Sequence, residues 1–424
     1  MKTIRALVER TIDLRPGELP ALLISFAYFF CLLSAYYIIR PLRDEMGILG
    51  GIKNLPWVFS ATFLVILAMV PLYGWVSSRF PRRQFLPLVY LFFISNLLIF
   101  YVLFYFQLAL DHVAQIFFVW VSVFNLFVVS VFWSFMNDIY DKDQAKRLFG
   151  SIAAGGTIGA LVGPLLTSWL AQPLGLHNLL LLSVALLGLA IVLIAKLSNW
   201  YDQKAHEKKD TAYQKPLNRN IFAAFSLVLN SPYLMGICLL ILMYTTLSTF
   251  LYFQQASIIS QNFSDSAQRT SVFAMIDLAV NALTIFIQLF FTGRLVKRLG
   301  LSWGLALIPI LLIAGFLVLS FIPVLSVLVV LQVLRRAGNY AIMRPGREML
   351  FVVLGREEKY KAKSFIDTVV YRGGDALSAW LYDGMRSAGF SIGQIALIAV
   401  PLAAAWAFVA YQLGIKREKL ANNA

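Results

Sequence analysis

Long apolar runs recur along this chain of 424 residues, from Leu19 to Ala410. Each run has about 20 residues, which is enough for an α-helix to cross a hydrocarbon layer of about 30 Å. A transmembrane β-barrel would instead alternate apolar and polar residues over segments of about 10 residues, and these runs are continuous. The sequence therefore predicts an all-α polytopic membrane protein.

Roughly 12 such runs can be delimited. They lie near residues 19–40, 55–78, 84–107, 113–137, 150–172, 177–197, 233–254, 270–293, 302–322, 325–345, 364–387 and 391–414. Composition agrees, because 60% of the residues are hydrophobic and only 13% are charged, against roughly 25% charged residues in soluble domains. No small-residue cleavage site follows the first run, so we interpret it as a retained helix and not as a signal peptide.

The net charge of +15 is explained largely by membrane topology. With the N-terminus in the cytoplasm, about 28 of the 36 Lys and Arg residues fall at cytoplasmic helix ends and about 4 fall outside, as the positive-inside rule requires. We therefore expect both termini in the cytoplasm, a location in a bacterial inner membrane, and no nucleic-acid partner. Cys31 and Cys238 both lie in predicted spans, where buried structural thiols are expected.

The longest polar stretch divides the chain into two halves of about six spans each. We predict an N-terminal six-helix bundle at residues 1–197, a cytoplasmic linker at 198–232 and a C-terminal six-helix bundle at 233–424. Such a division is typical of transporters whose halves move about a central site.

A motif of Gly and Arg recurs in corresponding loops of the two halves. Between spans two and three, Gly74 is followed five residues later by Arg79. Between spans eight and nine, Gly293 is followed at the same distance by Arg298. The match favours a parallel internal repeat.

The first of these loops also resembles a family signature. Gly74, Arg79, Arg82 and Arg83 are similar to the basic loop between spans two and three of the major facilitator superfamily, which has an acidic residue where this chain has Ser78. The resemblance implies a major-facilitator-like fold, in which spans one, four, seven and ten line a central cavity.

Spans five and eleven share a glycine pair, Gly155-Gly156 in the first and Gly373-Gly374 in the second. In span five, glycines recur every fourth residue at Gly155, Gly159 and Gly163, so they share one helical face. This spacing predicts close helix packing, because a phosphate-binding loop would need Gly-Lys-Ser/Thr after a strand.

Charged residues inside apolar helices cost at least about 2.5–3.5 kcal/mol at the helix centre, so they indicate a cavity, a partner or a function. At the end of span one, Tyr36, Arg40, Arg43 and Asp44 share one helical face. We predict that the first three contact an anionic substrate and that Asp44 orients or gates them. The alternative is that both arginines reach the outer interface and pair with Asp44 and Glu45.

Span ten carries a polar stripe with Arg335 beside it; its members, at i, i+3, i+4, i+8 and i+11, are Arg336, Asn339, Tyr340, Arg344 and Arg347. We predict that the first four bind the substrate together with Asn137 of span four, because both spans line the cavity in the superfamily. Arginine donates two parallel hydrogen bonds to phosphate or carboxylate, and aromatic rings can stack on a base. The predicted cavity therefore suits a planar or aromatic anion.

Three aspartates within spans are candidates for gating or coupling. Asp367 and Asp375 lie in span eleven with Arg372, and Asp277 lies in span eight. The alternative for span eleven is structural pairing of the aspartates with neighbouring arginines. Asp277 has the least obvious partner, and proton coupling requires a carboxylate that can titrate.

Two segments resemble a narrower family, the non-mitochondrial ATP/ADP translocases. They are residues 36–44 (YYIIRPLRD), similar to its first span, and residues 347–375 (REMLFVVLGREEKYKAKSFIDTVVYRGGD), similar to its loop into span eleven. Arg43 stands where that family has Lys. The resemblance implies counter-exchange of nucleotides, with basic residues holding the phosphates.

We therefore predict a monomeric secondary transporter of small organic anions, most specifically nucleotides or other phosphorylated solutes, that works by alternating access in contact with membrane lipid. The rivals are proton-coupled export of amphipathic compounds or lipids, which would depend on Asp277, and a non-transporting membrane scaffold. The sequence contains no paired nucleophile and base and no metal-ligand spacing, so we expect neither catalysis nor a cofactor.

Overall fold

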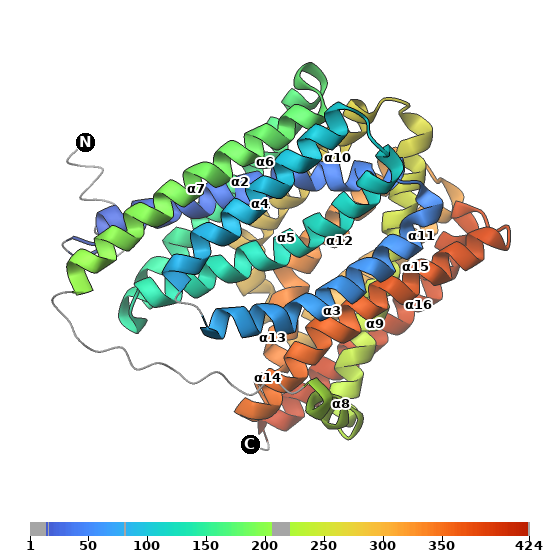
Figure 1. Cartoon of the computed structure of the whole chain (residues 1–424). Helices are drawn as coiled ribbons and strands as arrows, with labels where there is room; N and C mark the ends of the chain where they lie inside the picture. Colours follow the sequence, from blue (N-terminus) through green and yellow to red (C-terminus); the bar gives the residue numbers. More distant parts are fainter. Residues whose placement is uncertain (1–13, 16, 80–81, 206–220, 423–424) are drawn as a thin grey trace. The chain divides into compact units, whose positions relative to one another are not determined.

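The computed structural model of the protein describes residues 14–15, 17–79, 82–205 and 221–422. These residues form helices joined by short irregular segments, and they contain no β-strand (Figure 1). The prediction of an all-α chain is confirmed.

The helical elements differ in length and type, and three of them, η2, η3 and η4, are short π-helices. In chain order they are α2 (Leu19–Leu49), η1 (Ile52–Asn54), α3 (Leu55–Arg79), α4 (Arg82–Tyr105), α5 (Leu110–Ile139), α6 (Lys142–Leu174), α7 (Leu176–Ala205), α8 (Ile221–Leu229), α9 (Pro232–Asn262), α10 (Ser266–Ile287), η2 (Gln288–Thr292), α11 (Gly293–Phe321), α12 (Leu325–Gly338), η3 (Asn339–Met343), α13 (Arg344–Leu350), α14 (Arg356–Phe365), η4 (Ile366–Val370), α15 (Tyr371–Ser387) and α16 (Ile392–Asn422).

Eleven helical segments in the described part of the chain are long and apolar enough to cross a membrane. They correspond to every predicted run except 364–387. That run is also helical, from α14 through η4 into α15, but its charged residues make it too polar to meet the same criterion. The prediction of about 12 spanning helices therefore holds, with one span that is polar rather than apolar.

Several helices extend beyond the apolar runs. The first run was predicted to end near residue 40, whereas α2 continues to Leu49 with Pro41 inside it, so Arg40 and Arg43 lie within the helix. The segment 293–298, predicted as a loop, is the start of α11, and the backbone leaves helical geometry instead at Gly300, whose φ is 75°. Glycine adopts such a positive φ without steric cost.

The predicted linker at 198–232 is helical at both ends, because α7 continues to Ala205 and α8 covers Ile221–Leu229. Residues 206–220 lie outside the described part of the chain. The division of the chain into two six-helix bundles at this linker stays a prediction.

By their contacts, the residues form two compact units. Unit 1 comprises Met1–Leu49, Met69–Pro216 and Asp265–Leu278, and unit 2 comprises Gly50–Ala68, Leu217–Ser264 and Ala279–Ala424. The helices α3 and α10 are therefore each shared between the units.

In unit 1, α6 packs along α2 through the predicted glycine face (Figure 1). A Cβ atom added at Gly159 would lie 2.6 Å from the carbonyl oxygen of Phe30, and one added at Gly163 would lie 2.7 Å from Cβ of Tyr37. At Gly155 the added atom would collide with the Phe26 backbone. The prediction that this glycine ladder serves helix packing is confirmed.

Unit 2 repeats this contact with different residues. There α15 packs along α9, and a Cβ atom at Gly374 would lie 2.5 Å from Oγ1 of Thr245 in α9. Gly374 therefore allows α15 to approach α9 as Gly155 allows α6 to approach α2.

Substitution at the glycine face should destabilise the protein. Gly159→Ala should lower the free energy of unfolding by about 1–3 kcal/mol, because the added methyl group meets backbone that cannot rotate away. Thermal unfolding of the purified protein in detergent measures the change. Gly150→Ala is the matched control, since Gly150 lies in the same helix with no atom within 4 Å of an added Cβ. Equal melting temperatures for the two variants would contradict the packing role.

A buried carboxylate ties the start of α2 to α6. Glu18 accepts two hydrogen bonds from Arg147 and one from Gln144, each of 3.0 Å, and one of 3.0 Å from the backbone N–H of Arg15. Burial by itself would raise the pKa of Glu18. The hydrogen bonds from Arg147, from the Arg15 backbone and from Gln144 outweigh this effect and lower the pKa from 4.5 to about 2.

The contribution of Glu18 to stability should depend on pH. Because its folded-state pKa lies below its unfolded value, the contribution is complete above about pH 4.5 and is lost as the pH falls toward about 2. The difference in melting temperature between the wild type and Glu18→Gln should therefore shrink across this range. Asp111→Asn, which removes an exposed carboxylate at the start of α5, is the control. A Glu18→Gln difference that stays constant down to about pH 2 would exclude the lowered pKa.

Candidate functional site

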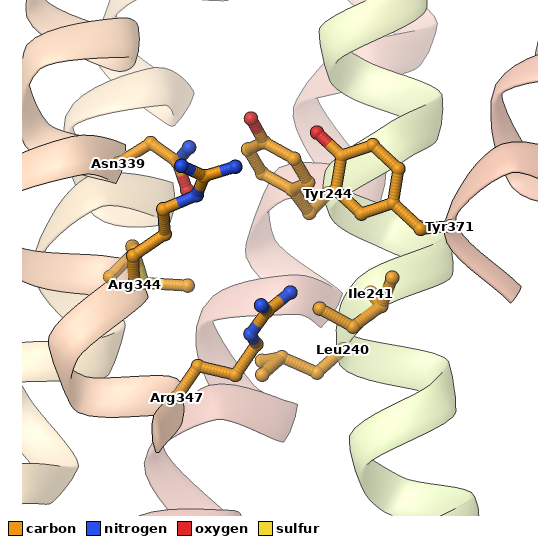
Figure 2. A pocket seen from close by; sticks show the side chains of 8 residues that line it. Leu240, Ile241, Tyr244, Asn339, Arg344, Arg347 and Tyr371 are labelled. Carbon is orange, nitrogen blue, oxygen red and sulfur yellow. The ribbon is translucent and has the colours of Figure 1, made fainter. Parts of the chain in front are cut away.

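A pocket in unit 2 collects side chains from α9, η3, α13 and α15. The residues that line it are Leu240, Ile241, Tyr244, Asn339, Met343, Arg344, Arg347 and Tyr371. Figure 2 shows the guanidinium groups of Arg344 and Arg347 extending toward the space beside α9, with the rings of Tyr244 and Tyr371 at its upper side. Two cationic and two aromatic groups thus share one small space.

The basic wall of the pocket is built by an irregular helix. The helix α12 passes into the π-helix η3 and then into α13, which starts with Arg344 and Pro345. Pro345 has no N–H to donate to the carbonyl group of Ala341, and Oγ1 of Thr292 donates to that carbonyl oxygen at 3.0 Å. Single π-helical turns are common at functional sites because they change the direction of the side chains that follow.

The two arginines of the pocket differ in how they are held. Arg344 is exposed, and its guanidinium lies 5.3 Å from the ring centroid of Tyr340. The Arg347 side chain is 13% exposed, and its Nη2 lies 3.0 Å from Oδ1 of Asp367. Nε of Arg347 is buried without a hydrogen-bond partner among the described residues. A buried donor of this kind requires an explanation, and a ligand that accepts a hydrogen bond is one.

The opposite wall of the pocket is aromatic and apolar. The ring centroids of Tyr244 and Tyr371 are 5.9 Å apart with an interplanar angle of 46°. Leu240 and Ile241 continue this wall along α9. Such a surface can pack against a flat, weakly polar group while the arginines hold an anionic one.

The structure brings together part of the predicted site. Asn339 and Arg344 line the pocket, and Tyr340 contacts Arg344. Arg336 is buried in α12, with 9% of its surface exposed. Arg347 was not among the predicted contacts, although it continues the same stripe of span ten at i+11 from Arg336.

Two tyrosines complete the lining. Tyr244 belongs to span seven, which the superfamily resemblance places at the central cavity, so the sequence already indicated it as a cavity residue. Tyr371 lies four residues after Asp367, on the polar face of span eleven, and was not among the predicted substrate contacts.

In span eleven, the structure shows the alternative of internal pairing. Asp367 pairs with Arg347, and Asp375 lies 3.7 Å from Arg372. A gate also needs pairs of this kind, because its partners must be able to exchange.

In unit 1, the arginines of span one are paired with acidic groups. Nε of Arg40 lies 3.4 Å from Oδ2 of Asp277, and Nη2 of Arg43 lies 2.6 Å from Oδ1 of Asp44. The expectation that Asp277 has no obvious partner is wrong, since α2 continues far enough to place Arg40 beside α10. The adjacent Tyr36 is buried, with 7% exposed.

Glu45 is fully buried and pairs with Arg269 of α10, not with an arginine of span one. Nη2 of Arg269 donates to Oε1 of Glu45 at 2.6 Å, Nε donates to Oε2 at 2.8 Å, and Oγ of Ser266 donates to Oε1 at 2.7 Å. The alternative in which Arg40 and Arg43 pair with Asp44 and Glu45 is therefore correct for Arg43 with Asp44 and wrong for Glu45.

The remaining predicted residues lie away from the pocket lining. Asn137 is exposed near the end of α5, and Gly293 and Arg298 are exposed in the first turns of α11. Gly74 lies within α3, which ends at Arg79. Arg82 and Arg83 begin α4, but the side chains of these two residues and of Arg79 lie outside the described part of the structure.

The sequence profile of the Major Facilitator Superfamily matches residues 21–346. The chain belongs to this superfamily. As a Major Facilitator Superfamily member with eleven apolar helices in its described part, it is an integral membrane protein of a transporter family.

The chain is also similar to proteins named ADP,ATP carriers. ADP,ATP carrier protein 1 of Chlamydia trachomatis is 21% identical in an alignment that covers 89% of this chain and 84% of the relative. ADP,ATP carrier protein 2 of the same organism is 23% identical in an alignment that covers 89% of this chain and 85% of the relative.

Two solved transporter structures resemble the fold. A bacterial homolog of the human lysosomal transporter Spinster, in an inward-facing and unoccupied conformation, has a TM-score of 0.59 at 15% identity and covers 95% of this chain and 99% of its own. The nucleoside transporter NupG has a TM-score of 0.60 at 15% identity and covers 96% of this chain and 99% of its own. At these identities the likeness shows a shared fold and nothing finer.

Proposed function

We propose that this protein transports nucleotides or other phosphorylated organic anions by alternating access, with the pocket of unit 2 as part of the substrate site. The observation that carries the proposal is the pairing of two arginines with two tyrosines in one pocket. Arg344 is exposed, and Nε of Arg347 is a buried donor without a partner among the described residues. A phosphate group accepts such donors with two parallel bonds.

The relatives agree with this substrate class. The similar proteins of Chlamydia trachomatis are named ADP,ATP carriers and align with 89% of this chain. A nucleotide would place its phosphates against Arg344 and Arg347 and its base against the wall of Tyr244 and Tyr371. Asn339, with an amide that both donates and accepts, would contact the sugar or the base.

Asp367 is proposed as a gating residue because it shares Arg347 with the substrate. Its carboxylate lies 3.0 Å from Nη2 of Arg347. A phosphate that enters the pocket would compete with Asp367 for the guanidinium of Arg347. Release of Asp367 would then couple substrate binding to movement of its helix. Arg372 and Asp375, 3.7 Å apart, are proposed to stabilise the same helix as it moves.

The residues of span one are proposed as a second set of anion contacts. Tyr36, Arg40, Arg43 and Asp44 lie together in unit 1, where the two arginines are already paired. They would bind substrate only after exchanging these partners. Asp277 lies beside Arg40, so proton-coupled export, the alternative, would require this carboxylate to titrate next to a guanidinium.

We further propose that the protein is a monomer in a bacterial inner membrane with both termini in the cytoplasm. The distribution of Lys and Arg over the helix ends supports this orientation.

Uptake into proteoliposomes tests the proposed function. Liposomes loaded with ADP should accumulate labelled ATP, and unlabelled ADP, ATP or AMP outside should compete with it. Liposomes that contain heat-unfolded protein control for leakage, and liposomes without internal nucleotide separate exchange from uniport. The proposal fails if no phosphorylated solute is either transported or bound by the folded protein.

A further inference from the structure

Arg335 is a buried cation that the proposed contacts do not use. It lies in the last turn of α12, and only 5% of the residue is exposed. Its Nε and Nη2 donate to Oε1 of Gln332 at 3.1 and 2.8 Å, and its Nη1 donates to Oγ of Ser248 at 2.6 Å. No ion pair in the described part of the chain includes this guanidinium.

The acceptors of Arg335 are held in place by a neutral network. Nε2 of Gln332 donates to Oε1 of Gln255 at 2.5 Å and to the carbonyl oxygen of Leu251 at 3.4 Å. Because its amide nitrogen is engaged with α9, Gln332 presents its oxygen to Arg335. Amide and hydroxyl dipoles can solvate a buried guanidinium, but they leave its unit of positive charge uncancelled.

The position of this charge relates it to the pocket. Asn339 follows Arg335 by four residues in the chain, and Ser248 follows Tyr244 by four residues in α9. Four residues of helix correspond to about 6 Å along the axis. Asn339 and Tyr244 both line the pocket, so Arg335 and its acceptor Ser248 each lie about one helical turn from a lining residue.

We propose that Arg335 determines how strongly the pocket discriminates among ligands by their negative charge. This inference rests on the proposed function. At an effective dielectric constant of about 20 and a separation of about 10 Å, one positive charge raises affinity by about tenfold for each negative charge on the ligand. A carboxylate in place of Gln332 would cancel the charge of Arg335 and remove this effect. The neutral network leaves that charge free to attract an anionic ligand.

Binding of AMP, ADP and ATP to the purified protein tests this role, because the three ligands share a base and differ in charge. Gln332→Glu keeps Arg335 and gives it a counter-ion, and Arg335→Met removes the charge. Both variants should lower the ratio of ATP affinity to AMP affinity by at least about tenfold. Arg335→Lys keeps the charge and should keep the ratio.

A matched control removes a different arginine of the same unit. Arg386 is exposed in α15, and its Nη1 donates to the carbonyl oxygen of Phe390 at 2.8 Å. Arg386→Gln should leave the ratio unchanged. Melting temperatures identify variants that do not fold. If Arg335→Met does not fold, the affinity ratio of Gln332→Glu, which retains the guanidinium, tests the role of the charge.

The outcomes separate the two claims. If the wild type binds the nucleotides and the ratio is unchanged in folded Gln332→Glu, Arg335 serves packing alone and the inference is overturned. If the wild type binds none of the three nucleotides, the proposed function fails instead. A uniform loss of affinity for all three ligands, with the ratio preserved, also overturns the inference, because a structural role predicts that result.

Discussion

Arg344→Met should lower the initial rate of ATP uptake at low substrate concentration by at least about 100-fold. The guanidinium of Arg344, which lines the pocket, is expected to donate two charge-assisted hydrogen bonds to phosphate, each of which contributes about 1.5–3 kcal/mol. Methionine retains much of the side-chain volume and loses both donors. Uptake of labelled ATP into proteoliposomes at several concentrations measures kcat/KM and shows whether the loss lies in binding or in turnover.

Arg386→Met is the control for Arg344→Met, because it removes an exposed arginine of the same unit outside the pocket. Its transport should equal that of the wild type. Arg347→Met should also reduce uptake, but the comparison must allow for Asp367, which loses its partner in that variant. Normal kinetics in both Arg344→Met and Arg347→Met would mean that the pocket of unit 2 does not bind the substrate.

Glu45→Met should lower the free energy of unfolding by about 3–5 kcal/mol, more than Gly159→Ala does. Glu45 is 0% exposed, and removing it leaves Arg269, whose side chain is 9% exposed, as a buried charge without its partner. A buried ion pair that loses one member costs more than the pair contributed, because the remaining charge stays out of water. Thermal unfolding in detergent, together with the yield of folded protein, measures the effect.

Two further variants show whether burial is the cause of the effect at Glu45. The double variant Glu45→Met, Arg269→Met should recover most of the lost stability, because no charge is left buried. Glu348→Met breaks a partly exposed pair with the same separation of 2.6 Å, in which the side chain of Glu348 is 44% exposed and that of Lys363 is 35% exposed. This variant should lower the free energy of unfolding by only about 0–1 kcal/mol. Equal losses in the Glu45 and Glu348 variants would contradict this explanation.

The membrane-spanning helices and the glycine contact were predictable because both follow from local spacing. In lipid, the backbone N–H and C=O groups of a continuous run of about 20 apolar residues find their partners within a helix, whatever the neighbouring segments are. Glycines at every fourth residue share a helical face wherever the helix lies, and in the structure that face meets α2 at Gly159 and Gly163. The polar stripe of span ten was likewise visible, and three of its members, Asn339, Arg344 and Arg347, line the pocket.

The partners of the charged residues were not predictable, because they come from helices that are distant in the chain. Asp277 lies beside Arg40, and Glu45 lies beside Arg269, across separations of more than 200 residues in the sequence. Spacing along one helix identifies a shared face, but it contains no information about which helix packs on that face or at what height. The first span illustrates this, since its apolar run ends near Arg40 whereas the helix continues to Leu49.

The amino-acid sequence by itself therefore determined that the chain is helical, that it crosses a membrane many times, and that a few arginines lie inside its spans. Only the tertiary structure decided which of these arginines are neutralised. Arg40 and Arg43 have carboxylate partners. Arg347 pairs with Asp367, but its Nε has no hydrogen-bond partner among the described residues. Arg335 is held by neutral groups alone. The physical reason is that membrane insertion depends on the composition of each segment, whereas the electrostatic state of a buried charge depends on the few side chains that packing places within about 4 Å of it.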